Sequence, residues 1–78
     1  MIAFNYHLHD FETPQVHAAY CNEETTPELF EKMTAGIYGG SLQVGIIADS
    51  AESLDQAIDL LKILKKRIRE NPKNRQTL

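Results

Sequence analysis

Three histidines near the start of the chain come closest, in type and spacing, to a reactive site. His7, His9 and His17 lie in two segments where apolar and polar residues alternate. If these segments form a β-hairpin in which paired residue numbers sum to about 26, His9 lies opposite His17. Three imidazoles on one sheet face can bind zinc, and an open fourth position would make the metal catalytic. Asp10 or Glu12 could then hold a ligating histidine in place.

The same histidines have a simpler interpretation, which we favour. The sequence contains neither CxxC nor HExxH, so the spacing is not that of a known zinc motif. Histidines are also ordinary residues on the solvated face of a sheet. Cys21, the lone cysteine, shares the parity of His17 and is followed by Glu23 and Glu24, which would raise its pKa. We therefore expect Cys21 to fill space in the core, and we expect no cofactor.

No other pattern in the sequence carries a recognisable reaction. The glycines form neither GxGxxG nor a phosphate-binding loop, and no Ser/His/Asp arrangement can be argued from their order. No motif assigns the chain to a family. We therefore expect a protein that is not an enzyme, with no catalytic residues.

Length and composition suit one small domain. The chain has 78 residues, which we divide into a domain over 1–71 and a polar, basic tail over 72–78. A lone cysteine is typical of a reducing compartment, so we expect a cytoplasmic protein. No apolar run approaches the roughly 20 residues of a membrane span, and the first residues do not resemble a signal peptide.

Residue periodicity predicts five elements in β-β-α-β-α order. Alternation predicts strands over 2–9 and 15–21, and a further strand over 41–49. Thr26 and Pro27 suit the start of a helix that ends near Gly36 or Gly39. In an alternative, residues 34–38 form a strand and Gly39-Gly40 a hairpin turn.

Ser50 is a suitable cap for a long helix over about 51–70, before Asn71-Pro72. The order of elements predicts an α+β fold. Its small, antiparallel-rich sheet would carry the long C-terminal helix packed on one face.

The long helix carries aliphatic residues on more than one side. At about 100° per residue, one arc would face the core, formed by Leu54, Ala57, Ile58, Leu61, Leu64 and Ile68. Leu60 then lies on the flank and Ile63 points away from the core. Single exposed aliphatics are normal, but a domain this small also gains from self-association. We therefore name a candidate partner or oligomer interface at Leu60, Ile63 and Arg67.

Charge is distributed unevenly along the chain. Residues 1–61 contain ten acids and one base, whereas residues 62–78 contain seven bases and one acid. One side of the long helix carries a stripe that runs from acids to bases: Asp55, Asp59, Lys62, Lys66, Arg69 and Lys73. This order suits the helix dipole on a solvated surface, but the bases exceed what the dipole requires. The stripe is our candidate charged interaction surface.

These observations predict a small interaction protein that binds a macromolecular partner, and can inhibit it, through charged surfaces. We expect a protein partner and a homo-oligomer. A second hypothesis is nucleic-acid binding through the basic segment from Lys62 to Arg75, although no aromatic residue interrupts that segment for base stacking. The histidine metal site and a small-molecule pocket at an oligomer interface are two further hypotheses. We do not expect membrane binding, because the apolar helix face is needed for the core.

Overall fold

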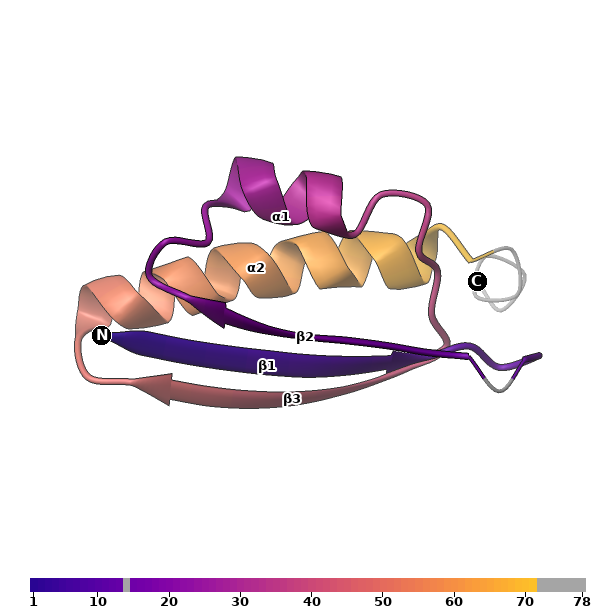
Figure 1. Cartoon of the computed structure of the whole chain (residues 1–78), viewed down its shortest axis with the longest axis horizontal. Helices are drawn as coiled ribbons and strands as arrows, with labels where there is room; N and C mark the ends of the chain where they lie inside the picture. The colour runs from indigo at the N-terminus through magenta and orange to yellow at the C-terminus, as the bar shows by residue number, and fades with distance from the viewer. Residues whose placement is uncertain (14, 72–78) are drawn as a thin grey trace.

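A three-stranded antiparallel sheet carries both helices on one face (Figure 1). The computed structural model describes residues 1–13 and 15–71. The elements are β1 (Ile2–His9), β2 (Val16–Asn22), α1 (Pro27–Met33), β3 (Ser41–Ala48) and α2 (Ala51–Arg69). The predicted α+β class and the β-β-α-β-α order are confirmed.

The first strand lies at the centre of the sheet, because the strand order is β2-β1-β3. Both neighbours run antiparallel to it. Its alternate residues Ile2, Phe4, Tyr6 and Leu8 are buried under the helices. The ring of Phe30 on α1 meets Phe4 and Tyr6 edge-on, at centroid distances of 6.2 and 5.6 Å. This aromatic contact joins α1 to the sheet.

Both helices begin at the capping residues that the sequence predicts. Thr26 Oγ1 accepts a hydrogen bond from the backbone N–H of Leu29 at 3.2 Å. Ser50 Oγ accepts one from the N–H of Ser53 at 3.1 Å. Each bond pairs one of the free N–H groups of a first helical turn.

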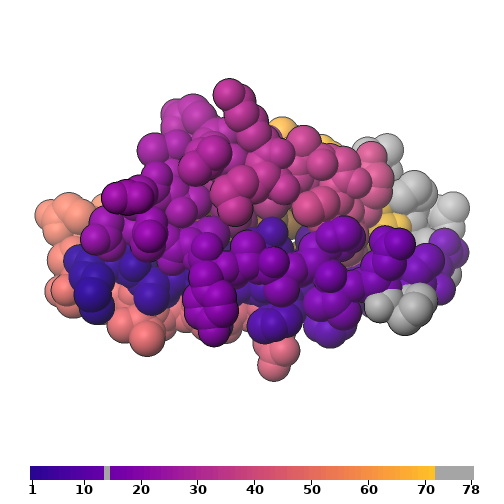
Figure 2. Space-filling view, viewed as in Figure 1, coloured from indigo at the N-terminus to yellow at the C-terminus, as the bar shows by residue number. Residues whose placement is uncertain are grey.

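In the segment between α1 and β3, the alternative prediction of a strand over 34–38 is wrong. The helix ends at Met33, and Gly36 adopts a φ of +77° in the turn that follows. Gly39 then approaches β1 so closely that a Cβ there would overlap the side chain of Leu8. Figure 2 shows α1 and this segment packed closely above β2.

Helix α2 lies over β1 and β3, and α1 flanks it on the β2 side. Gln56 marks that side, since its Nε2 donates to the backbone oxygens of Asn22 and Thr25 at 3.3 and 3.0 Å. Among the described residues, no helix combines the length and the apolar character required to cross a membrane.

Candidate functional site

The three histidines do not share a face, so the predicted zinc arrangement is wrong. Paired residue numbers in the hairpin sum to 25, which places His9 opposite Val16 and His17 opposite Leu8. His7 and His9 therefore lie on the open face of the sheet, and His17 lies on the helix-covered face. A shift of one residue in register exchanges the two faces of a strand. Within the part of the chain that the structure describes, no three His, Cys, Asp or Glu residues form a metal-binding group.

The expectation that Cys21 is buried is confirmed. Cys21 lies opposite Phe4 under the helices, with 5% of its surface exposed. Burial raises the pKa of its thiol, and a hydrogen bond with Thr25 opposes that shift in part. A thiol in this environment is a poor nucleophile at neutral pH.

The three residues predicted to face another chain are buried within this one. Leu60, Ile63 and Arg67 expose 0%, 7% and 6% of their surfaces. The prediction that Ile63 points outward is wrong because α2 is covered on two sides, by the sheet and by α1. The exposed aliphatics are instead Leu54 and Ile58, which the sequence analysis placed in the core.

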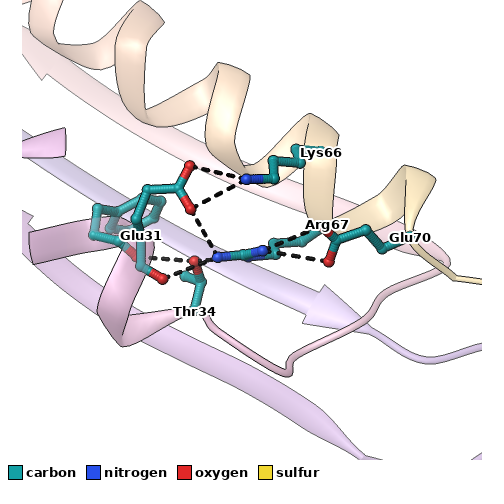
Figure 3. Close-up of polar contacts among 6 residues, drawn as sticks. Glu31, Thr34, Lys66, Arg67 and Glu70 are labelled. Atoms are coloured by element: carbon teal, nitrogen blue, oxygen red, sulfur yellow. Dashed lines mark hydrogen bonds and ion pairs between the residues drawn. The ribbon is translucent and has the colours of Figure 1, made fainter. Parts of the chain in front are cut away.

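Arg67 is the centre of a polar network between the two helices (Figure 3). Its Nη2 donates to the main-chain oxygen and to Oε2 of Glu31, each at 2.9 Å. Its Nε donates to Thr34 Oγ1 at 3.1 Å, and its Nη1 to both carboxylate oxygens of Glu70 at 3.3 Å. A buried guanidinium with this many acceptors has a structural role in positioning α1 on α2.

The predicted charged stripe lies on the solvent side of α2. All of its described members are exposed: Asp55, Asp59, Lys62, Lys66 and Arg69. Lys66 Nζ lies 3.4 Å from a carboxylate oxygen of Glu31. Lys73 lies outside the described residues. The last turns of α2 border an open hollow of about 500 Å³, lined by Lys62, Lys65, Lys66, Arg69 and Glu70.

The open face of the sheet is a surface that the sequence analysis did not identify. We define it by the twelve residues that the strand register places away from the helices: Ala3, Asn5, His7, His9, Val16, Ala18, Tyr20, Asn22, Ser41, Gln43, Gly45 and Ile47. None of them is Asp, Glu, Lys or Arg, although these four residue types make up 24% of the chain. All three strands lack these four residue types at every position, so the missing charge was visible along the sequence, and only the grouping of these twelve residues on one face required the register.

Two large side chains stand out on the open face. Tyr20 on β2 is 84% exposed and Ile47 on β3 is 65% exposed. Between them lies a shallow, mainly apolar hollow of about 220 Å³, whose other lining residues include Ala3, Asn5 and Gly45. A Cβ at position 45 would overlap the Asn5 side chain, so the lack of a side chain at Gly45 leaves room for Asn5 in this part of the face.

Comparisons with protein-family models, curated proteins and solved structures found no match to this chain.

Proposed function

We propose that this protein is a binding module that uses the open face of its sheet to engage the surface of another protein, without catalysing a reaction. The absence of charged side chains from all twelve positions supports this proposal. Depletion of charge around an exposed aromatic residue, here Tyr20, is the pattern of an interface centre, where charges would have to be desolvated.

The chemistry of the open face favours a protein over other ligands. It presents no Lys or Arg to a phosphate backbone, which a nucleic acid needs for affinity. Its hollow of about 220 Å³ is shallow, and drug-sized ligands usually occupy pockets of roughly 300–1,000 Å³. A partner's protruding apolar side chain suits this hollow better than a free small molecule does.

Tyr20 and Ile47 are the anchors of this proposed contact. Tyrosine is enriched at the energetic centres of interfaces because it offers a large contact area and a hydrogen-bonding hydroxyl. Its side chain has few rotatable bonds, so little conformational entropy is lost on binding. The neighbouring Asn5, His7 and Gln43 supply hydrogen-bonding groups, and none of these side chains carries a formal charge when the histidine is neutral. Binding of this kind would inhibit a partner whenever the covered surface is the one that the partner uses.

A matched pair of tyrosine variants tests the proposal. Affinity capture from native lysate, followed by mass spectrometry, compares wild type with Tyr20→Arg and with Tyr38→Arg. Tyr38 is 44% exposed and lies between α1 and β3, outside the open face. We expect at least one protein to be captured by wild type and Tyr38→Arg but lost with Tyr20→Arg. If every captured protein is retained by Tyr20→Arg, the open face is not the binding surface.

The basic hollow on α2 favours one second candidate, which is binding of a nucleic-acid backbone. Lys62, Lys65 and Arg69 border it, and their exposed side chains suit phosphate contacts. This candidate predicts retention of labelled RNA or DNA that weakens steeply with salt and is lost on Lys62→Glu with Lys65→Glu. Absence of binding at low salt would exclude it.

The free thiol of Cys21 accords with a reducing environment, so we place the protein's action in the cytoplasm. Fractionation of the source cells, with detection by an antibody, tests this location.

A further inference from the structure

Strand β3 forms one edge of the sheet, because within the described part of the chain it pairs with β1 alone. Its eight residues include no charged residue and no proline. Natural proteins usually protect a long exposed edge with such residues or cover it with another element. The outer edge of β3 is therefore chemically suited to accept another strand.

An aliphatic surface on α2 lies beside this edge. Leu54 and Ile58 are 50% and 46% exposed, and Leu61 is partly buried. At about 100° per residue, Leu54 and Leu61 lie roughly opposite Ile63 and Gln56, which face the α1 side of the helix. Because α2 lies over β1 and β3, this surface is directed towards the β3 edge. We call Leu54, Ile58 and Leu61 the α2 stripe.

Strand spacing allows two copies to meet at both surfaces together. If β3 pairs antiparallel with its own copy, the two-fold axis lies about 2.4 Å outside β3, which is half a strand spacing. If the axis of α2 lies midway between β1 and β3, it is about 2.4 Å inside β3. The two α2 helices would then be separated by about 9.6 Å, within the 8–10 Å typical of packed helices. Strand pairing thus brings the two stripes into packing distance.

The charges on α2 complement those of a second copy in this arrangement. The two helices would run antiparallel, so the N-terminal half of each would lie beside the C-terminal half of the other. Asp55 lies in the first half, and Lys62 and Lys65 lie in the second. At about 100° per residue, all three lie within about 60° of Ile58 around the helix, beside the α2 stripe. None of these three forms an ion pair within the described part of the chain. Each is therefore available to an opposite charge on the other copy.

The other sheet edge lacks this complementarity. Strand β2 leads into residues 23–31, which contain four glutamates and no base. A two-fold pairing of β2 with its copy would bring two such acidic segments towards each other, and their repulsion opposes association. Charge therefore distinguishes β3 from β2 as the edge for self-association.

We propose that two copies of this chain associate through antiparallel β3–β3 pairing and contact between their α2 stripes. The product is a six-stranded sheet with four helices on one face. The open faces become continuous, and their combined plane grows from about 26 by 14 Å to about 26 by 29 Å. The larger plane approaches the roughly 800 Å² per partner of a standard interface. This last consequence rests on the proposed function, whereas the dimer itself does not.

A charge exchange tests the antiparallel dimer on the full chain. One variant carries Asp55→Lys, and the other carries Lys62→Glu and Lys65→Glu. All three positions are exposed, and circular dichroism checks that both variants fold. Size-exclusion chromatography with light scattering, at about 50 μM and low salt, should show a wild-type dimer and a weaker dimer for each variant. An equimolar mixture should recover a heterodimer, because each helix half again meets its opposite charge.

Two further measurements separate this dimer from other associations. Ile58→Glu should lower the association constant of the dimer at least tenfold, whereas Leu29→Glu on the exposed surface of α1 should leave this constant unchanged. Tyr20→Arg should also leave it unchanged, so loss of the partner and loss of the dimer can be told apart. A wild-type monomer at 50 μM, or a variant mixture that dimerises no better than its components, would overturn the proposal.

Discussion

Nη2 of Arg67 on α2 lies 2.9 Å from Oε2 of Glu31 on α1, and the two residues are 36 positions apart in the chain. The guanidinium is almost fully buried, whereas the carboxylate is 39% exposed. Lys66 reaches the same carboxylate from the solvent side at 3.4 Å. One acid therefore takes part in a buried contact and an exposed contact, which allows the two to be compared directly.

We expect Arg67→Met to destabilise the fold by about 1–3 kcal/mol, because Thr34 and the main-chain oxygen of Glu31 lose buried hydrogen-bond donors. Methionine keeps much of the aliphatic volume, so the loss reports mainly on polar contacts. The matched change Lys66→Met should cost less than about 1 kcal/mol, as is usual for an exposed ion pair. Urea unfolding of both variants measures the difference. Equal losses would contradict the structural role assigned to Arg67.

We expect Gly39→Ala to destabilise the protein by about 1–3 kcal/mol through overlap of the new methyl group with Leu8. Gly36 provides the control, because among the described residues no atom beyond its chain neighbours lies within 4 Å of a Cβ at that position, and its φ of +77° leaves backbone strain as the cost of a side chain. Gly36→Asn should therefore cost less stability than Gly39→Ala, because asparagine is among the residues that adopt a positive φ most readily. A wild-type midpoint for Gly39→Ala would show that the segment before β3 can move away from β1.

The amino group of Met1 and the carboxylate of Asp49 should make stability depend on pH at both ends of the range. Their atoms lie 2.7 Å apart. The pKa of the amine is raised above its ordinary 8.0, chiefly by the hydrogen bond to Asp49. The pKa of Asp49 is lowered below its ordinary 3.8, chiefly by the bond from that amine.

The contribution of this pair is therefore present between about pH 4 and pH 8. It is lost as pH falls through the lowered pKa of Asp49, and as pH rises through the raised pKa of the amine. NMR titration of Met1 in wild type and in Asp49→Asn measures the effect. The pKa of the amine should decrease in the variant, and an unchanged value would exclude the pair in solution.

The thiol of Cys21 should react slowly while the protein is folded, because burial both shields it and raises its pKa. We expect reaction with a disulfide reagent at pH 7.5 to be at least tenfold slower in buffer than in 6 M urea. Thr25→Val removes the hydrogen bond that lowers the thiol pKa and should not accelerate the reaction. Rapid labelling of the native protein would indicate that the end of β2 opens readily.

Local patterns were sufficient to predict the elements. The alternation of Ile2, Phe4, Tyr6 and Leu8 matches the buried side of β1. The caps at Thr26 and Ser50 correctly located both helix starts. Each of these signals depends only on neighbouring residues, which is why one sequence was enough.

Relationships between elements were not predictable in the same way. The face of α2 was misplaced because one aliphatic arc was assumed, whereas the helix is buried on two sides. Ser53, Leu60, Ile63 and Arg67 face the sheet or α1, which leaves Leu54 exposed. The histidine site failed because the turn before Val16 sets a register one residue away from the assumed one. Neither fact follows from periodicity within a single element.

The central position of β1 also has a consequence for the order of folding during synthesis. β1 and β2 can pair as soon as the short turn between them exists, since Leu8 lies opposite His17. Pairing of Leu8 with Leu42 must await β3, and Leu60 and Leu64 reach the core later still. The nascent hairpin therefore presents Phe4 and its buried neighbours to solvent until first α1 and then α2 have been added. A chain whose synthesis stops before α2 would remain prone to aggregation. Early chaperone contact at this hairpin would therefore favour a high yield of folded protein.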